Sequence, residues 1–93
     1  MTAPETGVDA KFRQQVVDIM TTVLARLLDR SDPITEDMRL MDELGLSSTL
    51  GLELMLEVED QLLVLIDVEM MDQDQLKTLG DLATFVAGHC RPA

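Results

Sequence analysis

The sequence predicts an all-α domain built from four helical segments, with one long loop between the first two. Three observations support this fold class. Apolar residues recur at steps of three and four along most of the chain, no segment is a convincing strand, and cap-forming polar residues stand where the periodic segments begin. A chain of 93 residues is long enough for one hydrophobic core and too short for two. We therefore expect one domain over residues 9–90, between an N-terminal tail at 1–8 and a C-terminal tail at 91–93.

The first helix is expected from Asp9, its N-cap, to about Asp29. Its apolar positions repeat at helical spacing and are Phe12, Val16, Ile19 or Met20, Val23 and Leu27. Ser31-Asp32-Pro33 ends the helix, and a loop then runs through Gly45. Loops of this length are uncommon in small domains and are often functional. Three apolar residues are expected to anchor it to the core: Ile34, Leu40 and Leu44.

The second helix is expected from about Ser48 to Leu63 or Val64, with the Ser47 side chain able to act as its N-cap. Apolar residues repeat at helical spacing along it, namely Leu52, Leu56 or Val58, and Leu62. Acidic residues fill the positions between them: Glu53, Glu57, Glu59 and Asp60. This pattern predicts an amphipathic helix with a strongly acidic face.

The segment after the second helix is the most ambiguous part of the chain. A short third helix is expected around Met70 to Leu76, although the apolar run from Leu63 to Val68 also fits a buried strand. The last helix is clearer, because Thr78-Leu79-Gly80-Asp81 is similar to a capping box. Its apolar side is expected to carry Leu79, Leu82, Phe85 or Val86, and His89.

Several short motifs follow one another around the start of the second helix, and their order is informative. Reading backwards from Ser48, the chain has Leu44-Gly45, then Leu40 before an acidic pair, and Ile34-Thr35 at the loop entry. Reading forwards, it has Leu52-Glu53-Leu54 and Glu59-Asp60-Gln61-Leu62. From Ile34 to Leu62 this order resembles, without a gap, the acyl carrier and peptidyl carrier protein family. With the flanking helical segments, the similarity covers roughly residues 10 to 90.

The resemblance implies a small four-helix bundle of acyl-carrier type and a covalent 4'-phosphopantetheine arm on Ser48. A separate phosphopantetheinyl transferase would attach the arm from coenzyme A, and the arm's thiol would carry acyl or aminoacyl groups as thioesters. A helix N-terminus suits the phosphate ester because its amide groups are unpaired and its dipole end is positive. Attachment at Ser47 is the alternative, but it shifts the pattern by one residue and puts Gly51 where the Leu52 position belongs. The carrier would have no catalytic activity of its own.

The resemblance also implies a docking surface on the second helix. Its apolar centre would be formed by Thr49, Leu52 and Leu56, and its acidic rim by Glu53, Glu57, Glu59 and Asp60. Basic surfaces on the transferase, on acyl- or aminoacyl-loading enzymes, and on synthases and acyltransferases would complement it. Contacts of this kind mainly raise the association rate and break easily, as a monomeric shuttle requires.

The chain departs from the family in two places. The family most often has Asp-Ser-Leu at the attachment point, where this chain has Ser47-Ser48-Thr49, and the run Leu63 to Ile66 is more apolar than usual. These departures favour a discrete carrier of polyketide, nonribosomal peptide or other specialised metabolism. A fatty acid synthesis carrier is the alternative. An acidic helical adaptor that binds a partner without a cofactor is an alternative of another class.

Composition excludes several other functions. The net charge of −11, from 18 acidic and 7 basic residues, argues against nucleic-acid partners, which require clustered lysine and arginine. The acids at Asp67, Glu69, Asp72 and Asp74 lack the spacing of a calcium-binding loop, so no metal site is expected. Ser48 has no neighbouring base, and His89 is the only histidine, so no catalytic residues are expected. One cysteine, Cys90, and no membrane-length apolar run fit the cytoplasm, and a bacterium is the default source.

Overall fold

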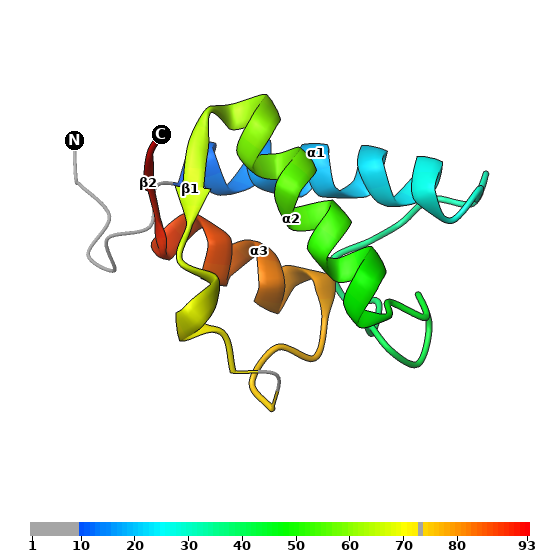
Figure 1. Cartoon of the computed structure of the whole chain (residues 1–93). Coiled ribbons are helices and arrows are strands. Elements are labelled where there is room, and N and C mark those ends of the chain that lie inside the picture. Colours follow the sequence, from blue (N-terminus) through cyan, green and yellow to red (C-terminus); the bar gives the residue numbers. More distant parts are fainter. Residues whose placement is uncertain (1–9, 73) are drawn as a thin grey trace.

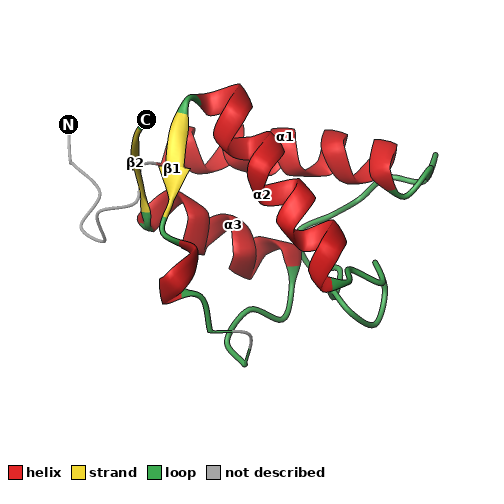
Figure 2. Cartoon of the chain, viewed as in Figure 1, coloured by secondary structure: helices red, strands yellow, loops and turns green. Residues whose placement is uncertain are grey.

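Three α-helices enclose one aliphatic core, and two short strands lie side by side at one end of it (Figures 1 and 2). The computed structural model describes residues 10–72 and 74–93. The elements, in chain order, are α1 (Ala10–Leu27), α2 (Ser48–Leu62), β1 (Val64–Ile66), the 3-10 helix η1 (Val68–Met70), α3 (Leu79–Gly88) and β2 (Cys90–Pro92). The long loop between α1 and α2 lies at the end of the domain opposite the strands (Figure 1).

Helix α1 follows the predicted periodicity closely. Its buried residues form a continuous stripe made of Val16, Val17, Met20, Val23 and Leu24. Phe12, Ile19 and Leu27 lie at the edges of this stripe and are half-buried. The helix ends at Leu27, near the predicted boundary, and Asp29 then takes a left-handed conformation with φ of 52°. The predicted N-cap, Asp9, lies outside the described residues.

The loop from residue 28 to residue 47 is held to the core by its apolar side chains, as predicted. Leu40 and Leu44 are buried, Ile34 is half-buried, and Leu46 adds a further buried anchor. The loop backbone also pairs with the segment just before α3, since the Leu40 N–H donates to the Lys77 carbonyl across 2.9 Å. These contacts fix the entry into α2, and so the position of the serines there.

Helix α3 begins at the predicted capping box. The Thr78 hydroxyl accepts a hydrogen bond from the Asp81 N–H, and the Asp81 carboxylate accepts one from the Thr78 N–H. Reciprocal bonds of this type satisfy amide groups that a helix start otherwise leaves unpaired. The helix buries Leu79, Leu82, Ala83 and Val86. His89 follows its last residue as an exposed C-cap and does not belong to its apolar side.

The predicted third helix at Met70 to Leu76 is absent from the described residues of that segment. Met70 ends η1, and Asp74 and Gln75 lie in a turn. The Asp72 side chain accepts a hydrogen bond from the Asp74 N–H at 3.0 Å, which is a local bond that competes with helix formation. The described fold is therefore a three-helix domain with a small sheet, and the expectation of an all-α four-helix bundle is not confirmed.

The alternative prediction of a buried strand between Leu63 and Val68 is confirmed in part by β1, which is shorter and has one buried residue. It pairs antiparallel with β2, so that Leu65 lies opposite Arg91. The sheet therefore includes Arg91 and Pro92, which we expected in a C-terminal tail. Pro92 fits here because it lies opposite Val64 at a position where its missing N–H would not point toward β1. Ile66 turns inward and is buried, whereas Leu65 is exposed.

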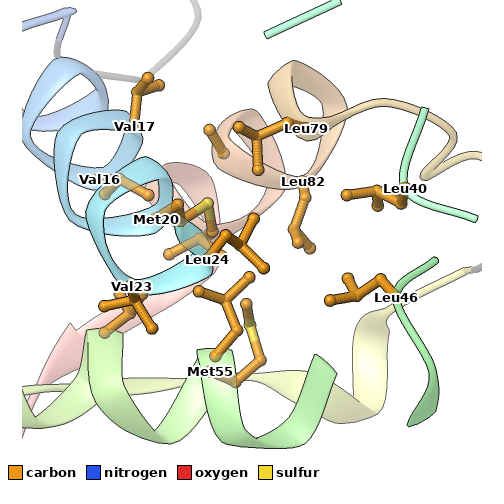
Figure 3. Close-up of a cluster of buried hydrophobic side chains, with 14 of the residues drawn as sticks. Val16, Val17, Met20, Val23, Leu24, Leu40, Leu46, Met55, Leu79 and Leu82 are labelled. Atoms are coloured by element: carbon orange, nitrogen blue, oxygen red, sulfur yellow. The ribbon is translucent and has the colours of Figure 1, made fainter. Parts of the chain in front are cut away.

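The core is formed where α1, α2, α3 and the long loop meet (Figure 3). Figure 3 shows Met20 and Leu24 of α1 in one cluster with Leu82 of α3 and Met55 of α2. All buried side chains among the described residues are aliphatic, alanine or methionine. At the edge of this core, Arg13 links α1 to the loop and to α3 by donating to Glu36 at 2.6 Å and to Thr84 at 2.9 Å.

Candidate functional site

The start of α2 presents two consecutive serines directly after the long loop. Ser48 is the first residue of the helix, and Ser47 is its N-cap. The Ser47 Oγ accepts a hydrogen bond from the Leu50 N–H at 3.2 Å, which confirms the predicted capping role. Because Ser47 makes this bond, it is committed to the helix end, and Ser48 is the serine that follows the cap.

The loop residues before the serines explain how this helix start is positioned. Leu44 and Leu46 are buried on either side of Gly45, which has φ of 60°. This left-handed conformation favours glycine because a side chain there would be strained. The Leu46 N–H also donates to the Leu40 carbonyl at 2.8 Å. The Leu-Gly pair therefore turns the chain between two core anchors and places the helix N-terminus at the surface.

An apolar pocket of about 310 Å³ lies next to this helix start. Its wall is apolar apart from Ser47 and Gly51 and consists of Leu40, Met41, Leu46, Leu52, Met55, Val68, Met71, Leu76 and Leu82. Ser47 is the residue of the N-cap, so the pocket is adjacent to the attachment position expected from the sequence. Three of the lining residues, Val68, Met71 and Leu76, belong to the segment between α2 and α3, whose sequence fits more than one structure. In the sequence, their apolar character was the signal that could have indicated a place in the pocket wall.

Helix α2 also has an exposed face that combines apolar and acidic residues. Leu52 is 59% exposed and Leu56 is 55% exposed, although both follow the helical periodicity. The side of α2 that packs into the core is formed instead by Leu54, Met55 and Val58. A shallow hollow on the exposed face is lined by Glu53, Leu56, Glu57 and Asp60. Thr49, the remaining apolar-centre residue expected from the sequence, is also exposed.

Two of the predicted rim acids have partners within the chain. The Glu57 carboxylate lies 3.1 Å from the Arg26 guanidinium of α1. The Glu59 carboxylate accepts a hydrogen bond from the Ile66 N–H at 2.8 Å and so ties the end of α2 to β1. Glu59 was predicted only as a docking residue, and this second role was missed because the chain reversal after α2 was not predicted. Among the predicted rim acids, Glu53 and Asp60 are exposed, whereas Glu57 and Glu59 are half-buried.

Other reactive groups in the described part of the chain offer no second site. Residues 10–72 and 74–93 contain no group of three or more histidine, cysteine, aspartate or glutamate side chains placed to hold a metal ion. Cys90 starts β2 and packs against the core, and burial raises the pKa of its thiol. His89 stacks on Phe85. Within the same residues, every helix is too short or too polar to cross a membrane.

Comparison with known proteins adds one finding. The family model described as the phosphopantetheine attachment site matches residues 14–86 of the chain, which include all of α2 and most of α1 and α3. No curated protein and no solved structure matches the chain. The matched range contains the helix start, the apolar pocket and the acidic face described above.

Proposed function

The chain belongs to the phosphopantetheine attachment site family, and we propose that Ser48 is the residue that carries the arm. Members of this family are carriers without catalytic activity, and they hold their substrates on a covalent 4'-phosphopantetheine arm. The observation that supports Ser48 is its position as the first residue of α2, directly after the capping serine. A phosphate ester there lies at the positive end of the helix dipole.

In the proposed modification, the hydroxyl oxygen of Ser48 attacks the β-phosphate of coenzyme A. The phosphoanhydride bond breaks, adenosine 3',5'-bisphosphate leaves, and the hydroxyl proton passes to a base on the transferase. Ser48 supplies only the nucleophile. Once attached, the arm would supply the thiol on which cargo is held.

The attachment site is tested by incubating the chain with coenzyme A, magnesium and a broad-specificity phosphopantetheinyl transferase. Intact-mass spectrometry should show one added arm on the wild type and on Ser47→Ala, and none on Ser48→Ala. Ser47→Ala is the matched control because it removes the neighbouring hydroxyl. Modification of Ser48→Ala would contradict the assignment.

We further propose that partner enzymes dock on the exposed face of α2. The hollow around Leu56 is bordered by Glu53 and Asp60, and the whole chain carries a net charge of −11. A partner with basic side chains around an apolar contact complements this face. Such electrostatic complementarity mainly accelerates association. The transferase is the first such partner, and loading enzymes, synthases and acyltransferases follow it in the cycle.

Reversing the charge of Glu53 and Asp60 together to lysine tests this docking face. The double variant should lower kcat/KM for arm transfer, and the wild-type rate should fall as salt shortens the Debye length below about 8–10 Å. The matched control reverses two exposed acids outside α2, Asp18 and Glu69, with the same change in net charge. Equal losses in both double variants would mean that net charge matters and the α2 face does not.

For the cargo, we propose an acyl group handled by a carrier of specialised metabolism. The unusual Ser47 and Thr49 beside Ser48 support this pathway class. A carrier of fatty acid synthesis is the second candidate, and the apolar wall of the pocket favours it. Loading the arm with an octanoyl or a glycyl group discriminates between cargo types. An aliphatic chain that enters the pocket should raise the melting temperature above that of the glycyl form, whereas equal values would argue against an acyl guest.

A further inference from the structure

Leu63, the residue directly after α2, has a conformation and an exposure that are both unfavourable for a leucine. It is the C-cap of the helix, with φ of 55° and ψ of 49°, and its side chain is 73% exposed. Glycine is the usual residue at such a left-handed position because it has no Cβ to clash with the backbone. The only other described non-glycine residue with positive φ is Asp29, and aspartate tolerates this conformation better than leucine.

Backbone hydrogen bonds account for the left-handed conformation of Leu63, but they do not account for a leucine side chain at this position. Its N–H donates to the Glu59 carbonyl, and its own carbonyl accepts from the Ala93 N–H at 3.1 Å. Both bonds involve main-chain atoms only, so glycine would make them equally well. A strained residue that persists without a packing role points to a function for its side chain.

Leu63 is also not an isolated apolar residue on the surface. It follows Leu52 and Leu56 along α2, and all three are more than half exposed. The exposed acids Glu53 and Asp60 lie among them in the sequence. Single exposed leucines are common and need no explanation, whereas a contiguous group of exposed apolar side chains marks an interaction site.

We propose that Leu63 is an apolar anchor for the phosphopantetheinyl transferase, at the far end of the α2 docking face. This inference rests on the proposed function. Ser48 and Leu63 are fifteen residues apart, or roughly 22 Å along a helix. A small transient interface buries about 600 Å² on each partner, a patch about 28 Å across. An interface centred near Leu56 therefore reaches both the modified serine and Leu63.

The charge of the face defines the surface that Leu63 meets. Glu53 and Asp60 are exposed and acidic, so the transferase is expected to present an apolar socket for Leu63 beside lysine or arginine side chains. Residues that are fully desolvated on binding carry most of the binding free energy of an interface, whereas exposed rim charges mainly steer the encounter. Replacing Leu63 should therefore raise KM and leave the salt dependence of the rate nearly unchanged.

The test measures arm transfer and thermal stability for Leu63→Gly, using a transferase that modifies the wild-type chain. The glycine relieves the left-handed strain, so its melting temperature should rise, while kcat/KM should fall by about five- to tenfold through KM, as for a loss of one interface anchor. A structural role alone would move both properties in the same direction. Leu63→Asn, which tolerates the conformation but is polar, should show the same kinetic loss.

Two further variants complete the design. Leu63→Met keeps an apolar side chain and should lose at most about half of the efficiency. Asp29→Gly relieves positive φ at the end of α1, outside the docking face, and should leave arm transfer at the wild-type rate. Wild-type KM in folded Leu63→Gly and Leu63→Asn would overturn the role of Leu63 and leave the Ser48 assignment standing. A wild-type chain that no transferase modifies would instead remove both proposals.

Discussion

Leu54 and Leu52 lie two residues apart on α2, and truncating each to alanine should change a different property. Leu54 is fully buried at 0% exposure, whereas Leu52 is 59% exposed. Removing a buried leucine side chain loses its transfer free energy and leaves a cavity, at a cost of about 2–5 kcal/mol. At about 0.05–0.15 kcal/mol per residue, a domain of this length has roughly 5–14 kcal/mol of stability in total. Leu54→Ala therefore removes a large share of it.

The expected loss corresponds to a fall in melting temperature of roughly 10–30 °C. Urea unfolding measures the loss in free energy of unfolding. It is followed by far-UV circular dichroism, since the chain has no tryptophan or tyrosine for a fluorescence assay. Leu52→Ala should stay within about 0.5 kcal/mol of the wild type, as expected for a surface position. It should instead lower kcat/KM for arm transfer. A Leu54→Ala variant as stable as the wild type would show that the core-facing side of α2 is assigned wrongly. A loss of about 2–5 kcal/mol in Leu52→Ala would show the same.

Three further predictions concern stability. Gly80→Ala should lower the free energy of unfolding by about 1 kcal/mol in urea melts, because overpacking, at about 1–3 kcal/mol, exceeds the helix-propensity gain. Its Cβ would lie 3.3 Å from the Glu36 carbonyl oxygen, which is fixed by the Gly80 N–H at 2.8 Å. Backbone N–H groups of Thr78 and Lys77 hold the pKa of the Asp81 carboxyl below its ordinary value. Its contribution to stability is therefore present above the unfolded-state pKa of about 3.9 and is lost as pH falls through the folded-state pKa, so Asp81→Asn should show a smaller acid-induced loss than the wild type. Added salt should raise the melting temperature of the wild type, because it screens the repulsion within a chain of net charge −11, and a melting temperature independent of salt would contradict this.

The three α-helices could be predicted from local signals. Apolar spacing located α1, and the Thr78 and Asp81 pair located the start of α3. These signals were sufficient because each depends on residues within one or two turns of helix. The Ser47 cap was predictable for the same reason.

The sheet was only an alternative in the sequence analysis because it depends on distant residues. Val64–Ile66 pairs with Cys90–Pro92, more than twenty positions further along the chain. Nothing in the apolar run itself shows that this partner exists. The hydrogen bond from Ile66 to Glu59 follows from the same reversal, so a residue predicted as a docking acid also supports the fold.

The orientation of α2 was ambiguous in the sequence because apolar residues lie on both of its sides. Leu52 and Leu56 continue one apparent stripe, and Leu54 and Val58 form another. Only the positions of α1 and α3 determine that the second stripe is buried. The first is then left at the surface, where it forms the centre of the proposed docking face and, with the loop, part of the pocket wall.

The attachment of the arm to Ser48 is the claim on which the proposed carrier cycle depends. Its most direct test is to modify the wild-type chain enzymatically, digest it, and fragment the peptide that contains Ser47, Ser48 and Thr49 in a mass spectrometer. We predict that the phosphopantetheine mass is located on Ser48 alone. A fragment series that places the arm on Ser47 or Thr49 would contradict the assignment.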